Sequence, residues 1–314
     1  MIFSPKPFKP ASWLPNGHFQ TVYASLFMKV PRPEYRREII DLPDGDIIAA
    51  DWVDGETEAP VVVLIHGMEG DSESRYARLL MNKCQRLGWT GVVLHMRSCG
   101  GLLNRKPQFY HAGFYQDILH FMDEIMPKRI GSRRLYVTGV SLGGSQLTHY
   151  LSHASPPENL KAACLISAPM DLRGSADFMK SGINRLYIYK FTRSLLKKYR
   201  AKAELIANPE FEQNLSKARN FWDLDDGATA PMHGFKGAEE YYQKMSAKNR
   251  MHEIKLPTLY LASKDDPFIP VESMPAAIGD LPSILTDRGG HVGFVNGGGR
   301  SWMVSTVFDF FKNY

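Results

Sequence analysis

Gly139-Val140-Ser141-Leu142-Gly143 follows the apolar run Leu135-Tyr136-Val137 and precedes a helical pattern of apolar residues. A serine on a sharp turn from a strand into a helix is typical of a nucleophile elbow. The two glycines have a physical reason, because side chains two residues to either side of the serine would collide in so tight a turn. The segment therefore predicts that Ser141 is exposed at the end of a strand.

Strand and helix patterns alternate around this turn. The run Val61–Ile65 is continuous and mostly β-branched, which is typical of a strand buried on both faces of a parallel sheet. Before it, the turn signal Pro43-Asp44-Gly45 separates residues 38–42 and 46–53 and predicts a β-hairpin. After it, strands are expected at 91–96, 134–140 and 160–166, and helices at 74–87, 114–126 and 142–152. This order favours an α/β fold with a mostly parallel central sheet and helices on both faces.

The alternation stops at residues 170–253, which show only helical patterns, and then resumes. Helices are expected there at 183–205, 212–222 and 237–247, followed by strands at 257–262 and 283–286 and a helix at 300–312. A helical insertion between the last strands of such a sheet is typical of a cap. We therefore predict a core of residues 1–169 and 254–314, with an irregular proline-rich segment at 1–33, and a helical cap at 170–253.

A serine hydroxyl becomes a good nucleophile only beside a base that an acid orients. In this type of fold the order is serine, acid, histidine, with each partner on a loop after a late strand. Asp265 and Asp266 follow the strand at 257–262, and His291 follows the strand at 283–286. Both loops are expected at the carboxyl edge of the sheet, where ligand sites of open α/β sheets lie. His291 is the expected base, and either aspartate is a candidate for the acid.

An oxyanion hole requires backbone N–H groups. One is expected from Leu142, the residue after the nucleophile. The other is expected from Met68, in the loop His66-Gly67-Met68-Glu69-Gly70 that ends the strand at 61–65. We interpret His66 as a structural residue that holds loops by hydrogen bonds.

The whole chain resembles the α/β-hydrolase superfamily, and more narrowly the YheT-like bacterial hydrolases, which are related to the eukaryotic ABHD esterases and lipases. The resemblance implies an α/β-hydrolase fold, Ser141, Asp266 and His291 as the catalytic set, and esterase or acylglycerol-lipase-type activity. Asp266 is preferred over Asp265 because a proline follows it by four residues, as is usual in the superfamily. Ser98 departs from the family, which often has glycine there. The segments that carry the resemblance are Asn16-Gly17-His18-Phe19-Gln20-Thr21, His66-Gly67-Met68-Glu69-Gly70, Arg97-Ser98-Cys99-Gly100-Gly101, Tyr110-His111-Ala112-Gly113, Ser141-Leu142-Gly143-Gly144 and Gly289-Gly290-His291-Val292-Gly293-Phe294.

Composition excludes several other classes of protein. The 314 residues are 44% hydrophobic and 23% charged, which is ordinary for a globular protein. The net charge of +5 is too small to indicate nucleic-acid binding. Three scattered cysteines favour neither a disulfide framework nor a zinc site. With no ~18-residue apolar run and no signal-peptide pattern, we expect a cytoplasmic protein without a transmembrane segment.

We expect neither a metal nor a cofactor, because the chain contains no metal-ligand motif and no phosphate-binding glycine loop. His111 and Asp117 resemble the His–Asp pairs of acyltransferases, but their spacing differs and helix initiation explains them. His18 and His233 match family positions without an assigned role. The cap also carries a basic run, which we interpret as a solvated helix face; the alternative is a surface for anionic lipid or acyl-CoA with weak membrane contact. That run is Arg185, Lys190, Arg193, Lys197, Lys198, Arg200 and Lys202.

These observations lead to one main hypothesis. The protein hydrolyses carboxylic esters with apolar, lipid-like acyl chains, through Ser141, Asp266, His291 and an acyl-enzyme. One alternative is an acyltransferase or thioesterase that uses the same residues. The other is a non-catalytic binding module, against which the intact order of serine, acid and histidine argues.

Overall fold

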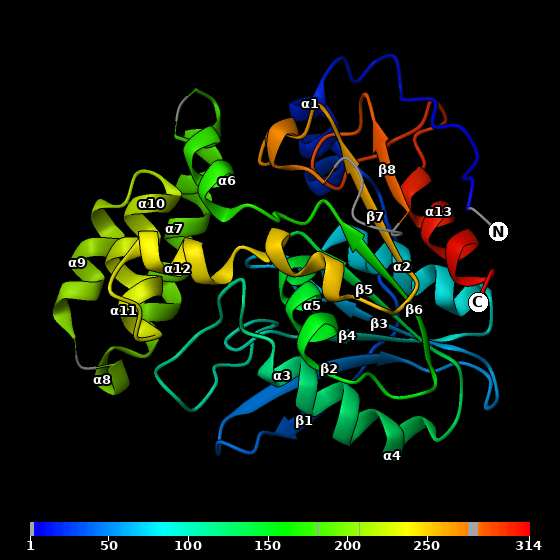
Figure 1. Cartoon of the computed structure of the whole chain (residues 1–314), viewed down its shortest axis with the longest axis horizontal. Helices are drawn as coiled ribbons and strands as arrows, with labels where there is room; N and C mark the ends of the chain where they lie inside the picture. Colours follow the sequence, from blue (N-terminus) through cyan, green and yellow to red (C-terminus); the bar gives the residue numbers. More distant parts are fainter. Residues whose placement is uncertain (1–2, 181, 207, 276–281) are drawn as a thin grey trace.

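The computed structural model describes residues 3–180, 182–206, 208–275 and 282–314. A sheet of eight strands runs through it in the order β1-β2-β4-β3-β5-β6-β7-β8. β1–β2 and β2–β4 are antiparallel and the other neighbours are parallel, which confirms the predicted hairpin and the mostly parallel sheet (Figure 1). The strands are β1 Arg36–Asp41, β2 Ile47–Val53, β3 Val61–Ile65, β4 Thr90–Leu94, β5 Leu135–Val140, β6 Leu160–Ile166, β7 Thr258–Ser263 and β8 Ser283–Thr286.

Alternate side chains of β3 enter two separate cores, one on each face of the sheet. Val61, Val63 and Ile65 pack in the first core, and Val62 and Leu64 pack in the second. Helices cover both faces, so β3 is buried on both sides, as its unbroken apolar sequence predicts. The first core is covered by α3 Gln116–His120, the π-helix η2 Phe121–Ile125, α4 Met126–Ile130 and α5 Leu142–His153, and the second by α2 Arg75–Arg86 and α13 Trp302–Phe311.

The expectation of an irregular segment at 1–33 is wrong for residues 17–27. They form α1 Gly17–Val22 and the π-helix η1 Tyr23–Phe27. Asn16 caps α1, because its side-chain oxygen accepts the N–H of Phe19 at 3.2 Å. At the other end, the guanidinium of Arg75 donates to the carbonyls of Ser25, Leu26 and Met28. This distant arginine satisfies carbonyls at the end of η1, and nothing in the local sequence indicates it.

The interval between β6 and β7 contains helices and, in the part that the structure describes, no strand. Figure 1 shows most of these helices gathered to the left of the sheet. In the described ranges of the chain, no helix has both the length and the apolar character needed to cross a membrane. The helices are α6 Leu172–Phe178, α7 Asn184–Ala201, α8 Ala203–Ile206, α9 Pro209–Lys217, α10 Phe221–Leu224, η3 Asp225–Thr229, α11 Ala230–Met232, α12 Ala238–Met245 and η4 Ala247–Glu253; a short helix, η5 Val271–Ser273, follows β7.

The helix expected over 212–222 is wrong in its bounds. α9 begins at Pro209, because the Asn208 side chain caps it and proline suits a first helical turn. It ends at Lys217, where the backbone of Ala218 turns extended. A second cap, Asn220, then begins α10. Two asparagine caps thus divide what the apolar periodicity alone presents as one helix.

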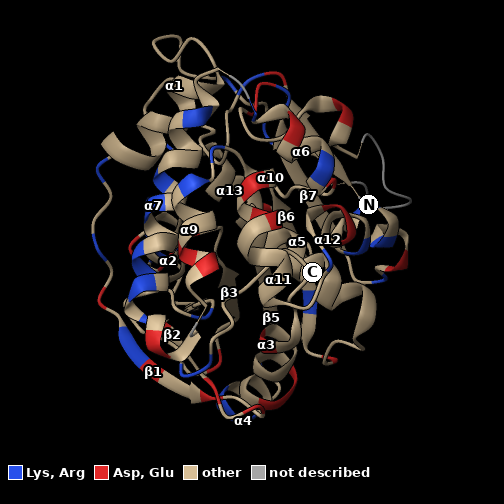
Figure 2. Cartoon of the chain, turned by 90° about the vertical axis from the view of Figure 1, so that its left-hand side faces the viewer, with Lys and Arg blue, Asp and Glu red and all other residues tan. Residues whose placement is uncertain are grey.

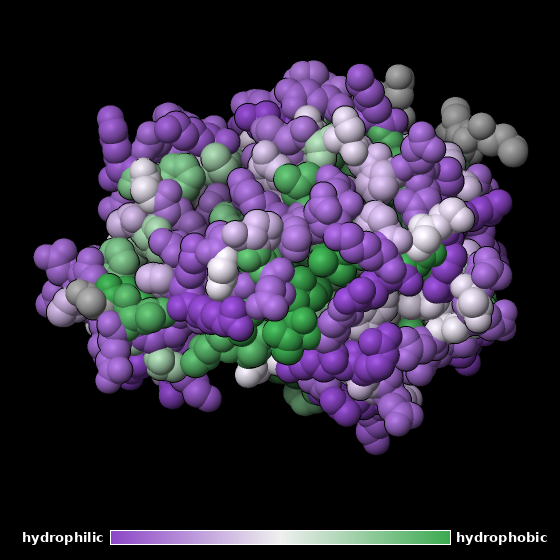
Figure 3. Space-filling model, turned by 90° about the horizontal axis from the view of Figure 1, so that it is seen from below, coloured by the Kyte–Doolittle hydropathy of each residue, from purple (hydrophilic) through white to green (hydrophobic). Residues whose placement is uncertain are grey.

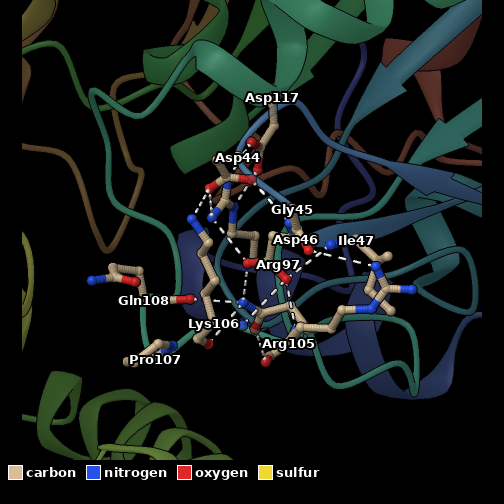
Figure 4. Close-up of polar contacts among 12 residues, drawn as sticks. Asp44, Gly45, Asp46, Ile47, Arg97, Arg105, Lys106, Pro107, Gln108 and Asp117 are labelled. Carbon is tan, nitrogen blue, oxygen red and sulfur yellow. Dashed lines mark hydrogen bonds and ion pairs between the residues drawn. The ribbon is translucent and has the colours of Figure 1, made fainter.

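A buried guanidinium joins the hairpin turn to the helical face of the core. Arg97, which follows β4, donates to both carboxylate oxygens of Asp117 at 2.9 and 2.7 Å. Its third nitrogen donates to Asp46 at 2.9 Å and to Asp44 at 3.0 Å (Figure 4). The charge of Asp117 is therefore paired with that of Arg97 in the described structure. This ion pair accounts for Asp117 without a His–Asp pair of the acyltransferase type.

The same cluster reaches the cap through Asn104. The Asn104 amide donates to Asp46 at 2.6 Å, and its oxygen accepts from Lys202 at the end of α7 at 2.8 Å. Ser98 also donates to that oxygen, at 2.5 Å. Ser98 has φ +59°, the left-handed conformation that favours glycine, which is the physical reason why a glycine suits this position.

Replacing Arg97 with methionine should destabilise the fold strongly. The change leaves Asp46 and Asp117 buried without their cation, which costs about 3–5 kcal/mol. Urea unfolding of wild type and R97M measures the difference. Lys128→Met is the matched control, because it removes an exposed pair with Glu124 and should cost less than about 1 kcal/mol. Equal losses in the two variants would contradict the assignment of Arg97 as the structural cation.

Candidate active site

Ser141 lies where β5 turns into α5, with φ +52°, a conformation that residues other than glycine rarely adopt. The turn is so tight that a Cβ at Gly143 would come within 2.3 Å of the His66 carbonyl oxygen. A Cβ at Gly139 would come within 2.6 Å of the Gly143 carbonyl oxygen. Both glycines are therefore required by close backbone contacts, and the elbow geometry matches the expectation from sequence.

His291 lies between Ser141 and Asp266. Its Nε2 is 2.9 Å from the Ser141 Oγ, and its Nδ1 is 2.8 Å from Oδ2 of Asp266. Because a carboxylate only accepts hydrogen bonds, this contact places the imidazole proton on Nδ1 and leaves Nε2 to accept from the serine. The other oxygen of the buried Asp266 accepts the N–H groups of Phe268 and Ile269 at 2.7 and 3.3 Å. The structure thus brings the three predicted residues into one hydrogen-bonded chain.

Asp265 lies in a different environment. Its Oδ1 accepts from the Ser263 hydroxyl and from the Gly290 N–H, both at 2.8 Å. It therefore holds the loop that carries His291 and makes no contact with the imidazole nitrogens. The structure separates two adjacent aspartates whose sequence positions alone leave both open.

The loop that carries His291 is also held by α1, a contact that the sequence analysis missed. The His291 N–H donates to the Thr21 hydroxyl at 2.8 Å. The Gln20 side chain makes two bonds with the backbone of Val295, at 2.8 and 3.1 Å. Gly17 and Gly290 meet so closely that a Cβ on Gly290 would lie 2.3 Å from the Gly17 carbonyl oxygen. The signal was present in the segment 16–21, which resembled the family but had no assigned role.

The two expected oxyanion donors flank the serine. Leu142 is the first residue of α5, where a helix leaves its backbone N–H without an intrahelical partner. Met68 belongs to the loop after β3, whose Gly67 lies so near the serine that an added Cβ would be 3.0 Å from the Ser141 Cβ. Met68 and Leu142 both line the cavity that contains Ser141 and His291.

The loop that contains Met68 is bonded to the cap helix α7 through Glu69. Glu69 has φ +55°, and its carboxylate accepts from Lys198 at 2.6 Å and from the hydroxyl of Ser194. The Tyr110 hydroxyl bonds both the backbone N–H and the carboxylate of Glu69, at 2.8 and 2.7 Å. Four hydrogen bonds therefore converge on the residue that follows Met68.

The basic run of the cap is not a uniformly solvated face, so that interpretation is corrected. The Lys198 side chain is only 18% exposed where it pairs with Glu69. Lys202 is buried against Asn104 and the carbonyl of Lys106, and burial lowers its pKa to about 8. Both cations were counted as surface charges because helical periodicity does not show which loops of the core the helix meets.

The serine opens into a cavity of about 520 Å³ with mainly apolar walls. α1, η1, α6 and α7 form its outer part, and Phe268 packs against His291 with ring centroids 4.3 Å apart. Of the eleven phenylalanine, tyrosine and tryptophan residues at 170–253, five line this cavity: Tyr187, Phe191, Phe221, Tyr241 and Tyr242.

The four other histidines named in the sequence analysis pack against neighbouring groups of the fold. His66 bonds the Met96 N–H and the Gly67 carbonyl, and burial lowers its pKa to about 3, in keeping with a structural role. His18 stacks on Tyr187. His111 and His233 meet with ring centroids 4.5 Å apart at a second, smaller cavity of about 40 Å³. Over the described ranges, no group of three or more histidine, cysteine, aspartate or glutamate side chains is placed to hold a metal ion.

Comparison with known proteins gives consistent matches over nearly the whole chain. The family described as alpha/beta hydrolase fold matches residues 60–297. The protein of Escherichia coli (strain K12) named "Putative esterase YheT" is 33% identical over 98% of this chain and 93% of its own. The monoacylglycerol lipase of Saccharomyces cerevisiae is 28% identical over 95% of this chain and 79% of its own. The solved structure of the Pyrococcus furiosus esterase PF2001 matches with a TM-score of 0.59 at 17% identity, over 90% of this chain and 91% of that chain, which shows a shared fold.

Proposed function

The chain belongs to the alpha/beta hydrolase family, and we propose that it is a serine hydrolase that cleaves carboxylic esters of apolar acyl chains. The observation that carries this proposal is the chain of hydrogen bonds from Ser141 through His291 to Asp266, at 2.9 and 2.8 Å, beside an apolar cavity. The names of two relatives, an esterase and a monoacylglycerol lipase, support the same reaction class.

The proposed reaction follows from the positions of the atoms. The Ser141 Oγ attacks the acyl carbonyl while the His291 Nε2 accepts the hydroxyl proton. Asp266 holds the imidazole and stabilises its charged form. His291 then gives the proton to the leaving alcohol, which leaves an acyl-enzyme. Water, deprotonated by the same imidazole, releases the acid and restores the serine.

The negative charge that develops on the carbonyl oxygen needs donors that are already in place. We assign these to the N–H groups of Met68 and Leu142. The Met68 loop is held by Glu69, whose carboxylate is in turn held by Lys198 and Tyr110. We therefore assign Glu69 as a positioning residue, which acts on the reaction through the loop that carries Met68.

The nucleophile and its acid can be tested together. A fluorophosphonate should label Ser141 and no other serine, because only an activated hydroxyl reacts with it. Mass spectrometry of the labelled peptide, with Ser141→Ala as the blank, identifies the site. Asp266→Asn should slow labelling and lower kcat by about 10⁴-fold, as in triads that lose their acid. Asp265→Asn is the matched control and should cost much less; a larger effect in that variant would reverse the assignment.

Glu69→Gln should lower kcat with little change in KM. The oxyanion exists only in the transition state, so a displaced donor loop weakens that state more than substrate binding. We expect a loss of about tenfold or more, below the 10²–10³ that follows complete removal of a donor. Glu239→Gln, which breaks an exposed pair with Arg173 on the cap, is the control. A change in thermal stability alone, with kcat intact, would show that Glu69 is only structural.

The apolar cavity predicts a dependence on acyl length. Each fully buried methylene contributes about 0.8 kcal/mol, so kcat/KM for p-nitrophenyl esters should rise by up to about tenfold per two carbons until the cavity is full. Phe191→Ala, which enlarges the cavity, should move the optimum to longer chains. Phe211→Ala removes a cap aromatic that does not line the cavity and should leave the optimum in place. A flat profile from acetate to decanoate would show that the cavity is not the acyl site.

A further inference from the structure

Two segments that are far apart in sequence form the mouth of the cavity. One is α1 with η1, and the other is the amino-terminal half of α7. They touch where the His18 Nδ1 lies 3.3 Å from the Tyr187 hydroxyl. Leu26, Ile183 and Leu186 line the cavity and are also more than half exposed, so the cavity reaches solvent between these segments.

This mouth is surrounded by large apolar side chains that face solvent. Phe27 is 65% exposed at the end of η1, and Leu186 is 66% exposed on α7. Such residues cost solubility when they are grouped and usually mark a binding surface. We name this group the rim, and it consists of Phe19, Leu26, Phe27, Ile183, Leu186 and Tyr189.

The charges of the two rim segments have one sign. Residues 17–33 and 178–203 together contain ten lysines and arginines and no aspartate or glutamate. Those 43 residues would carry about four or five acidic residues at the average frequency of the chain. The rest of the chain has 28 basic and 33 acidic residues, so the net positive charge comes from these two stretches; of their cations, Arg185 and Lys190 lie in the amino-terminal half of α7. Figure 2 shows the basic positions along α7, next to α1, which carries no charge.

The exposed cations of α7 nearest the rim keep their charge unpaired. Lys198 and Arg200 pair with Glu69 and Glu212, whereas within the described residues Arg185 and Arg193 have no carboxylate at ion-pair distance. Glu34, Asp177 and Glu204 border the two segments in the sequence, and Glu73 contacts the first segment through Arg32. Glu73 is paired with Arg32 and Arg78, and Asp177 is paired with Arg173 and Lys180.

Exposed apolar side chains also occur elsewhere. Figure 3 shows a band of them among hydrophilic residues on the face seen from below, away from α1. Exposed apolar area alone therefore does not identify a lipid-facing surface. The rim differs in two ways, because it is continuous with the cavity of Ser141 and because its two segments have no acidic residues.

We propose that the rim docks the protein on bilayers that contain anionic phospholipid, so that an acyl chain passes from the membrane into the cavity. The apolar side chains enter the interface and the α7 cations lie against the lipid phosphates, as in amphipathic surface helices. This inference rests on the proposed function only for the fate of the acyl chain. The docking itself depends on the surface.

Vesicle sedimentation tests the docking. The full chain should sediment with phosphatidylcholine vesicles that contain one-third phosphatidylglycerol, less with phosphatidylcholine alone, and less at high salt. The double change Arg185→Gln and Arg193→Gln should weaken binding by about tenfold or more. The control Lys161→Gln and Lys312→Gln removes the same net charge from exposed positions outside the rim and should bind like wild type.

The apolar contribution is tested with the double variant Phe19→Ser and Phe27→Ser, which changes two exposed residues outside the proposed catalytic set. This double variant should lose vesicle binding and keep wild-type hydrolysis of a short, water-soluble ester. Wild type that does not sediment with anionic vesicles, or rim variants that bind as the control does, would overturn the proposal. So would a lipid-free dimer, seen by light scattering, that the serine changes dissociate, because the rim would then hold a second copy. Vesicle binding without any ester hydrolysis would contradict the proposed function and leave the docking proposal supported.

Discussion

The close approach of α5 to the end of β3 is the constraint on which the site depends. The backbone at Gly143 lies directly against the carbonyls of Ile65 and His66, with no room for a Cβ. Because β3 and β5 are neighbours in the sheet, this approach brings the serine at the end of β5 beside the loop after β3. Ser141, the proposed nucleophile, and the two proposed oxyanion donors are therefore brought together by one packing contact.

The histidine depends on a second support, which comes from the start of the chain. α1 bonds the His291 loop through Thr21 and Gln20, and Asp265 holds it from the other side. A flexible loop would lose the alignment of the imidazole, because a general base acts only within hydrogen-bond reach. Part of the segment that the sequence analysis expected to be irregular thus supports the candidate active site.

The cap is bonded to the core at polar points as well as by apolar packing. Lys198 reaches Glu69 beside the oxyanion loop, and Lys202 reaches Asn104 in the cluster around Arg97. The ammonium groups of both lysines lose water and gain a small number of hydrogen bonds. This exchange is favourable only where the acceptors are already held in place. The same helix, α7, therefore lines the cavity, bonds the loop that contains Met68 and presents its remaining cations to solvent.

The alternation of strands and helices could be determined from the sequence, because its apolar patterns are local, and it implies a parallel sheet because each crossover helix returns the chain in the same direction. The order of serine, acid and histidine is read directly along the chain. The pattern of the elbow glycines is also visible in the sequence, although only Gly139 meets a near neighbour, Gly143, whereas Gly143 meets the carbonyls of Ile65 and His66 at the end of a neighbouring strand. The resemblance already favoured Asp266 over Asp265 as the acid, and the tertiary structure shows that Asp266 contacts His291. The helix α1, the enclosure of Lys198 and Lys202, and the division of the helix at 212–222 required the tertiary structure. In these cases the deciding partner is distant in sequence, or a side-chain cap competes with the apolar pattern, and only the folded chain brings the two groups together.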